Sequence, residues 1–189
     1  MKAPLFYSKI LLFGEYGIIK NSKGLSIPYN FFKGGFKIGS FENKNVKESN
    51  SNLIDFKNFL TKIDKSVVEF DFDKLEEDLK KGMFFDSSIP QGYGVGSSGA
   101  LVAALYDRYA LNKITVLENL TKPKILILKN IFSRMESFFH GKSSGLDPLN
   151  SYLSLPILIH SKNEIETTGI PSQSSYGKGA VFLLDSGIS

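Results

Sequence analysis

The chain has 189 residues, 42% of them hydrophobic and 13% aromatic, a composition typical of one well-buried globular domain and not of a disordered segment. It has no cysteine and only two histidines, which excludes a disulfide framework and a thiolate or histidine-rich metal site and leaves magnesium, held by oxygen ligands, as the expected ion. The net charge of +4 suits an anionic ligand, but only two of the 23 basic residues are arginine and no basic cluster stands out, which disfavours nucleic acid as a partner.

The first predicted elements are two strands separated by a turn. Residues 5–19 are apolar and contain Gly14 and Gly17, which indicates a strand, a turn and a second strand. The apolar run at 10–13 lies between Lys9 and Glu15 and is too short for a signal sequence or a membrane span. We therefore expect a cytoplasmic protein without a membrane partner.

Four further elements are predicted before the glycine-rich part of the chain. The polar stretch 42–52 is expected to be a surface loop, and apolar residues then recur at helical spacing over 53–63. A short helix is predicted over 73–81, with Asp73 as its N-cap, and its lysines are expected to form a solvated face. A short strand follows over 83–88.

The stretch PQGYGVGSSGA at residues 90–100 follows this strand, and a helix is predicted after it, up to Tyr109. Glycines let a backbone turn so that successive amide groups point at phosphate oxygens, and a helix N-terminus adds unpaired amides and the positive end of its dipole. The hydroxyls of Ser97 and Ser98 are suited to bind a phosphate oxygen or magnesium. The order of strand, glycine loop and helix therefore predicts a phosphate site.

Three other interpretations of this loop compete with a phosphate site. A Walker A loop needs a lysine after its glycines, and none is present here. Residues 94–99 do fit the G-x-G-x-x-G spacing of a dinucleotide-binding loop, but the polar residues 86–91 separate them from a buried apolar strand. A glycine turn without a ligand is the plain structural alternative.

The last predicted elements are a long helix, a loop and strands. Apolar residues from Ile125 to Phe139 form one helical stripe, and this helix is expected to end near Gly141. A loop then carries Asp147, and strands are expected over 152–159 and 180–188. Because the chain stops directly after an apolar run, we expect residues 1–189 to be one domain of a longer protein whose C-terminal domain is missing.

Three segments, in the same order, resemble motifs of the GHMP kinases, and of mevalonate kinases in particular. Residues 90–100 resemble the signature P-x-x-x-G-L-G-S-S-A-A, with Val95 and Gly99 in place of the usual Leu and Ala. SKILLFGEYG at 8–17 resembles the first family motif, and ESFFHGKSSGLD at 136–147 resembles E-x-x-x-H-G-x-P-S-G-x-D. The resemblance extends over almost the whole chain.

The chain departs from the mevalonate kinase pattern at three positions on the acceptor side. Tyr16, Ser143 and Pro148 stand where His, Pro and Asn are common. The family's second glycine-rich motif, which belongs to a C-terminal domain, is absent from the sequence.

The resemblance implies an α/β fold, specifically a two-layer sandwich of the ribosomal protein S5 domain 2-like type, with a largely antiparallel sheet on one side and helices on the other. It implies ATP and Mg²⁺, and transfer of the γ-phosphoryl group to a hydroxyl of a small-molecule substrate. Mevalonate, converted to 5-phosphomevalonate in isoprenoid biosynthesis, is the first candidate. Phosphomevalonate, sugar and homoserine kinases stay open, as do an NAD-dependent oxidoreductase and a non-catalytic nucleotide-binding module. A homodimer is also left open.

The same resemblance implies roles for individual residues. Asp147 would be the general base for the acceptor hydroxyl, Lys9 would stabilise the developing negative charge, and Ser98 and Glu136 would hold magnesium. The implied ATP-binding residues are Pro90, Gly92, Gly94, Gly96, Ser97, Ser98, Gly99 and Ala100, and the implied substrate-binding residues are Glu15, Tyr16, Ser144 and Gly145. Without the resemblance, Asp147 would be a turn residue and Lys9 and Glu136 surface charges, and His140 is expected to be only a helix-end residue.

Overall fold

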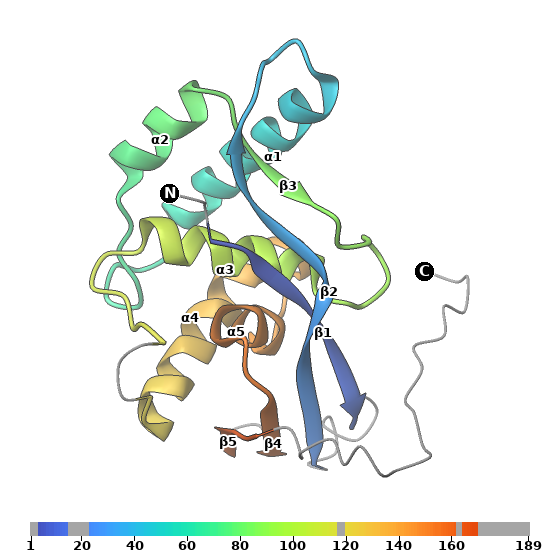
Figure 1. Ribbon diagram of the computed structural model, residues 1–189. Helices are drawn as coiled ribbons and strands as arrows, with labels where there is room; N and C mark the ends of the chain where they lie inside the picture. Colours follow the sequence, from blue (N-terminus) through green and yellow to red (C-terminus); the bar gives the residue numbers. More distant parts are fainter. Residues whose placement is uncertain (1–3, 15–22, 117–119, 162–163, 170–189) are drawn as a thin grey trace.

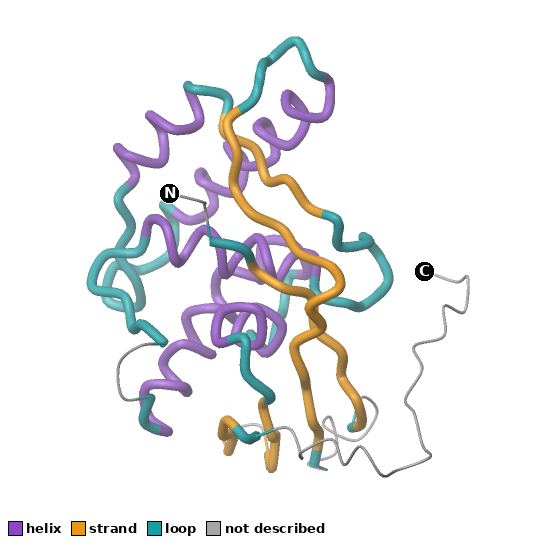
Figure 2. Tube along the Cα trace, in the orientation of Figure 1, coloured by secondary structure: helices purple, strands orange, loops and turns teal. Residues whose placement is uncertain are grey.

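The computed structural model describes residues 4–14, 23–116, 120–161 and 164–169, which form a sheet covered on one side by helices (Figures 1 and 2). The described strands are β1 (Phe6–Phe13), β2 (Gly24–Ile38), β3 (Met83–Ser87), β4 (Ile157–Ser161) and β5 (Glu164–Thr167). The described helices are α1 (Lys44–Leu60), α2 (Phe72–Lys80), α3 (Ser97–Tyr109), α4 (Lys122–His140) and α5 (Leu146–Leu153). This arrangement confirms the predicted two-layer α/β fold.

The long strand β2 organises the sheet. It pairs antiparallel with β1, β3 and β4, and β5 extends the sheet beyond β4. Within β2, Gly34 pairs with both Phe6 and Ser87, and the ring of Phe85 occupies the space that a side chain at Gly34 would need. The strand patterns of β1 and β3 are recognisable in the sequence, but that of β2 is not, because glycine and proline interrupt it. The second strand expected before residue 19 falls mostly outside the described residues.

Helix α1 corrects one prediction. Its N-cap is Asn43, whose Oδ1 accepts hydrogen bonds from the amides of Asn45 and Val46 at 2.9 and 3.4 Å. The helix therefore begins inside the stretch 42–52 that was predicted to be a loop. The buried face of this part includes a polar residue, Asn50, whose Nδ2 donates to the carbonyl oxygens of Leu79 and Met83 at 3.0 and 2.7 Å. These tertiary hydrogen bonds satisfy the buried amide group.

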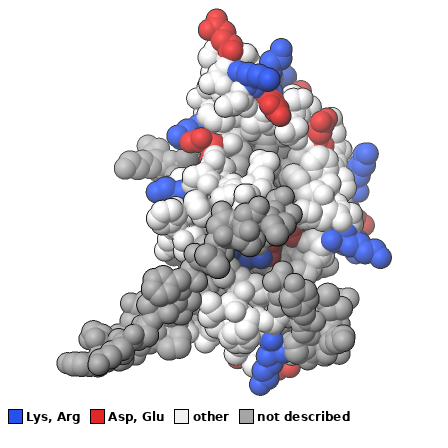
Figure 3. All heavy atoms as spheres, turned by 90° about the vertical axis from the view of Figure 1, so that its right-hand side faces the viewer, with Lys and Arg blue, Asp and Glu red and all other residues white. Residues whose placement is uncertain are grey.

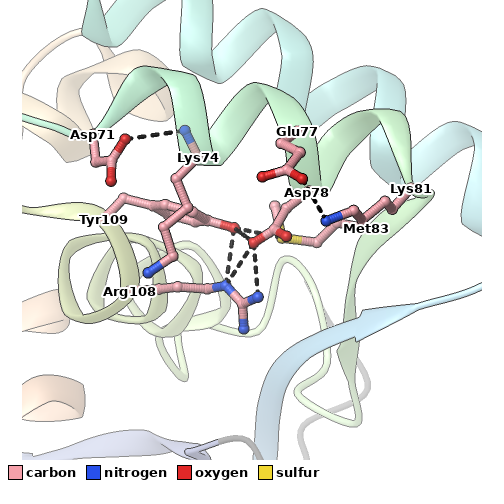
Figure 4. Close-up of polar contacts among 8 residues, drawn as sticks. All are labelled: Asp71, Lys74, Glu77, Asp78, Lys81, Met83, Arg108 and Tyr109. Atoms are coloured by element: carbon pink, nitrogen blue, oxygen red, sulfur yellow. Dashed lines mark hydrogen bonds and ion pairs between the residues drawn. The ribbon is translucent and has the colours of Figure 1, made fainter.

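Helix α2 corrects the predicted N-cap. Asp71, not Asp73, is the N-cap, and its side chain accepts the hydrogen bond from the Lys74 amide at 3.0 Å. Figure 4 shows how α2 is fixed to α3. The Oδ2 atom of Asp78 accepts hydrogen bonds from Arg108 Nη2 and Tyr109 OH, both at 2.7 Å. Burial alone would raise the pKa of Asp78, but these hydrogen bonds lower it overall. The partly buried ion pair of Asp78 and Arg108 thus joins two helices behind the sheet.

Helices α3, α4 and α5 form the layer behind β1 and β2 (Figure 1). The predicted helices at 101–109 and 125–139 are confirmed as parts of α3 and α4. The predicted loop around Asp147 is instead the first turn of α5, and the strand predicted from residue 152 begins only at Ile157. The strand predicted over 180–188 lies outside the described residues.

Aromatic side chains fill the space between these three helices. Tyr106, Phe132 and Tyr152 meet edge to face, with ring centroids 5.1 to 5.5 Å apart. Each comes from a different helix, so the cluster fixes α3, α4 and α5 relative to one another.

Within the described part of the chain, no helix combines the length and the apolar character that crossing a membrane requires.

Candidate functional site

The glycine-rich loop connects β3 to α3, and three of its glycines adopt a left-handed backbone. The φ angles of Gly92, Gly94 and Gly96 are 83°, 67° and 84°, a region that side chains disfavour. Gly96 is the N-cap of α3, and no side chain caps this helix end. The first amides of α3 are therefore not engaged by a capping side chain, which suits them to bind an anion.

Lys9 of β1 lies directly beneath this loop. Its backbone amide donates to the carbonyl of Val95 at 3.0 Å, and a side chain at Gly96 would place its Cβ 3.1 Å from Lys9 Cγ. The Lys9 side chain is only 10% exposed, and its Nζ lies 3.1 Å from Asp147 Oδ1. The loop thus packs against the stem of a buried lysine whose charge is paired with an aspartate from a distant segment.

Asp147 lies in the first turn of α5, where the positive end of the helix dipole favours a carboxylate. Its side chain is 36% exposed, so solvent and a ligand can reach it. One turn later on α5, the hydroxyl of Ser151 donates to the carbonyl of Tyr7 at 2.6 Å. This hydrogen bond fastens α5 to β1 close to the Lys9–Asp147 ion pair.

Glu136 of α4 is buried, with 3% of its surface exposed, which rules out a solvated surface glutamate. Ser98 Oγ donates to Glu136 Oε1 at 3.3 Å, and Ser143 Oγ donates to Oε2. Burial raises the pKa of Glu136 to about 7, the negative charge of Asp147 adds to the rise, and the two serine hydrogen bonds and Lys9 oppose it. His140 lies at the end of α4, as expected, and its Nε2 is 3.1 Å from Ser98 Oγ.

The donor atoms of Ser98 and Glu136 fit a magnesium ion that arrives with phosphate groups. Mg²⁺ prefers oxygen ligands and is usually held by one or two protein side chains, while waters and phosphate oxygens complete the octahedron. Among the described residues, no group of three or more histidine, aspartate or glutamate side chains is arranged to hold an ion alone. The site therefore fits Mg²⁺ bound together with a nucleotide better than a permanently bound metal.

Because the pKa of Glu136 is raised above its ordinary value of 4.5 to about 7, this carboxyl makes the fold less stable as the pH rises. Its favourable contribution is complete below pH 4.5 and is lost as the pH rises through 7. We expect Glu136 to lower the free energy of unfolding by roughly 3 kcal/mol over this window. Urea unfolding of the wild type and of Glu136→Gln, without nucleotide and at several pH values, measures this contribution as a difference.

The matched control for this experiment is Glu48→Gln, on the exposed face of α1. Its unfolding curve should follow that of the wild type over the whole pH range. If the stabilities of the wild type and Glu136→Gln instead run parallel from pH 4.5 to pH 7, the raised pKa is wrong.

The other residues predicted for the site differ in their exposure to solvent. Pro90, Ser97 and Ser98 lie on the loop or at the start of α3 and are partly exposed, whereas Gly99 and Ala100 are buried where α3 packs against the rest of the domain. Ser144 is exposed, and its Oγ accepts from the Leu146 amide at 3.3 Å. Gly145 is buried against α4. Glu15 and Tyr16 lie outside the described residues.

Ser143 was not predicted as a site residue. Its hydroxyl donates to Glu136 and accepts from the Gly145 amide at 3.0 Å, and its carbonyl accepts from Ser133 Oγ at 2.6 Å. It therefore links the buried carboxylate to the start of α5. The only signal in the sequence was that a serine stands where the family pattern usually has proline.

The fold also bears on the alternatives for the glycine loop. The strand before the loop, β3, pairs antiparallel with β2, whereas a dinucleotide-binding unit places its glycine loop after a strand of a parallel sheet. The G-x-G-x-x-G spacing at 94–99 therefore does not mark a dinucleotide-binding unit.

On the face shown in Figure 3, the basic and acidic side chains of the described residues are interspersed around the rim.

Comparisons with known proteins bear on the family and the fold of the chain. Residues 61–154 match the family model described as the GHMP kinases N terminal domain. A search of curated proteins found no match. Among solved structures, the mevalonate kinase of Methanococcus jannaschii is 21% identical, with a TM-score of 0.50 over 88% of this chain and 55% of that one.

A further structure described as a mevalonate kinase is also 21% identical, with a TM-score of 0.51 over 92% of this chain and 57% of that one. This chain thus spans just over half the length of these two kinases. At this level of identity, the likeness to the solved structures shows the fold. The chain carries the N-terminal domain of the GHMP kinases.

Proposed function

We propose that this chain is the nucleotide-binding and catalytic part of an ATP-dependent kinase that phosphorylates a hydroxyl group of a small molecule. The observation that carries the proposal is the ion pair of the buried Lys9 and the accessible Asp147, which lies beside the uncapped N-terminus of α3. A phosphate-binding helix end, a cation and an accessible carboxylate are the groups that phosphoryl transfer to an alcohol requires.

Asp147 has the role of general base in this proposal. It accepts the proton of the acceptor hydroxyl as that oxygen attacks the γ-phosphorus, and the bond between the γ-phosphorus and the β,γ-bridging oxygen of ATP breaks. Lys9 stabilises the negative charge that develops on the reacting oxygens, and before the reaction it orients the carboxylate. The two side chains therefore act as one unit.

The loop and α3 hold the triphosphate. The left-handed glycines expose backbone amides, and a helix end without a side-chain cap provides further donors. Ser98 and Glu136 would hold Mg²⁺, and Ser143 and His140 fix the positions of these two ligands by hydrogen bonds. When bound, the ion neutralises charge on the β- and γ-phosphates. Its positive charge also favours the ionised form of Glu136.

Mevalonate is the acceptor that we propose first. The segment ESFFHGKSSGLD and the pair Gly14–Glu15 match the mevalonate kinase pattern, and both solved structures compared above are described as mevalonate kinases. Glu15, Tyr16 and Ser144 are proposed to contact the acceptor. Phosphomevalonate, homoserine and sugar kinases are the alternatives within the family, because they share the phosphate loop.

A direct test measures phosphate transfer from ATP by the full-length protein to mevalonate, phosphomevalonate, homoserine and galactose. Transfer to mevalonate at the highest kcat/KM supports the proposal. Transfer to galactose alone would contradict the assigned substrate and keep the kinase chemistry. Tight ATP binding without transfer to any acceptor would favour a non-catalytic nucleotide-binding module.

A further inference from the structure

The first turn of α5 lies between α3 and α4, and a glycine lies at each of the two contacts. Gly99 of α3 faces this turn, and Gly145, the N-cap of α5, faces α4. On the α4 side, a Cβ added to Gly145 would lie 2.2 Å from the carbonyl oxygen of Lys129 and 2.6 Å from the amide nitrogen of Ser133. On the α3 side, a Cβ added to Gly99 would lie 2.8 Å from the carbonyl carbon of Asp147. Neither position has room for even a methyl group.

The contact at Gly99 cannot be relieved by rotating a side chain. A Cβ at this position would also lie 2.8 Å from Pro148 N and 3.0 Å from Asp147 Cβ, so the opposing atoms are backbone or attached directly to it. Pro148 is buried, and its ring fixes φ near −65°. Because Gly145 packs tightly against α4, the turn also cannot retreat away from α3. A side chain at residue 99 would therefore displace Asp147 itself.

We propose that Gly99 is a positioning residue, which sets the location of the Asp147 carboxylate relative to the phosphate-binding end of α3. The inference rests on the proposed phosphoryl transfer and deepens it. Gly99 and Pro148 are two positions at which the chain departs from the family pattern, and the structure places them in contact. Pro148 makes the turn rigid, and Gly99 leaves the space that the rigid turn occupies.

The functional consequence follows from how the reacting groups are held. Lys9 is fixed by β1 and by the loop, whereas the first turn of α5, which carries Asp147, is fixed by its packing against α3 and α4. The hydrogen bond from Ser151 to Tyr7 joins α5 to β1 only one turn later. A shift of α5 therefore changes the distance of 3.1 Å between Lys9 Nζ and Asp147 Oδ1 and moves the base away from the acceptor oxygen. Misplacement of a catalytic group by about 1 Å can lower a rate by about a hundredfold.

Gly99→Ala in the full-length enzyme tests the proposal. We expect kcat to fall by at least about tenfold, while the Kd for ATP, measured by calorimetry, changes by less than about twofold. The added methyl group points at α5 and leaves the loop amides in place. A crystal structure of the variant should show the Lys9–Asp147 distance lengthened beyond the 3.1 Å of the wild type.

Two further variants separate positioning from general damage to the fold. Ala104→Gly weakens the same helix on the side that faces Phe6 and Phe36, and it should lower the stability without lowering kcat. Gly99→Ala combined with Pro148→Ala lets the turn adjust its φ angle, so it should fold at least as well as Gly99→Ala and recover part of kcat.

Failure of the proposed function and failure of the role of Gly99 give different results. If the wild type transfers no phosphate, the proposed function fails, and the ion-pair distance in the Gly99→Ala structure still decides the positioning. An unchanged distance together with an unchanged kcat would overturn the role of Gly99. An equal loss of kcat in Ala104→Gly would also overturn it, because the loss would then reflect the stability of α3 alone.

Discussion

Asp147→Asn is expected to lower kcat by about a hundredfold to ten-thousandfold and to leave the affinity for ATP within a few-fold of the wild type. Asparagine keeps the shape and one hydrogen-bonding oxygen of the side chain but cannot accept the hydroxyl proton. Lys9→Met should also lower kcat, because the negative charge that develops on the reacting oxygens loses its nearby cation. Steady-state rates and a separate calorimetric ATP titration on the full-length protein provide the two measurements.

The double variant of Lys9 and Asp147 should lose less than the two single variants combined, since both residues act on the same developing charge. Asp86→Asn is the matched control. It breaks the exposed ion pair with Lys37, whose atoms lie 2.6 Å apart, and it should leave kcat unchanged. If chemistry is shown to limit the rate and Asp147→Asn stays within a few-fold of the wild-type kcat, Asp147 is not the general base.

Gly96→Val is expected to weaken ATP binding by at least about tenfold, equivalent to about 1.4 kcal/mol of binding free energy. The φ angle of +84° is unfavourable for a β-branched residue, and the new side chain meets Lys9, with Cβ 3.1 Å from Lys9 Cγ. Both the loop and the lysine must therefore shift. We also expect kcat to fall, because the displaced lysine belongs to the reacting unit.

Gly94→Ala separates these two effects. Gly94 has a similar positive φ of 67°, but a Cβ there meets no atom within 4 Å. Its matched partner is Gly96→Ala, which adds the same methyl group at a positive φ but places it against Lys9. Gly94→Ala should share the backbone strain at the loop and lower kcat less than Gly96→Ala. Calorimetry with ATP, together with thermal unfolding of each variant, measures the effects. Unchanged ATP affinity in a folded Gly96→Val protein would contradict the assignment of this loop to the phosphates.

The elements that were predicted correctly owe their structure to local sequence. The strand β3, the glycine loop and the helix α3 follow one another as their glycine and apolar patterns indicate, and the apolar stripe of α4 has regular helical spacing. The turns of the loop depend on glycines with positive φ angles, which few other residues adopt. Such features need no knowledge of what packs against them.

The incorrect predictions concern residues whose surroundings come from elsewhere in the chain. The polar composition of residues 42–52 made the start of α1 resemble a loop, although one of these polar residues, Asn50, is buried and its amide donates to carbonyl groups of α2 and β3. Asp147 was placed in a loop because Gly145 and Pro148 flank it, yet glycine serves as the N-cap of α5 and proline is tolerated in a first helical turn. Tertiary contacts hold both segments in place, since the turn that carries Asp147 packs at Gly145 against the backbone of Lys129 and Ser133 in α4.

The candidate site was predictable in its residue types but not in its physical state. The family resemblance named Lys9, Asp147, Ser98 and Glu136, and the fold brings each named pair together. Neither the burial of Glu136 nor its hydrogen bond from Ser143 could be predicted, because both depend on how α4 meets the start of α5. The contact between Gly99 and the backbone at Asp147 is likewise visible only in three dimensions.

The hydrogen bond from Ser151 to Tyr7 joins residues 144 positions apart, and it closes the sheet against the helix that carries Asp147. During synthesis, the Lys9–Asp147 pair cannot form until almost all of the described chain has left the ribosome. Contacts of such long sequence separation form slowly, because the chain loses the entropy of closing a large loop before the favourable contacts form. The Lys9–Asp147 pair therefore has no locally folded precursor, and a nascent chain with a complete glycine loop still lacks the aspartate that we propose as the base.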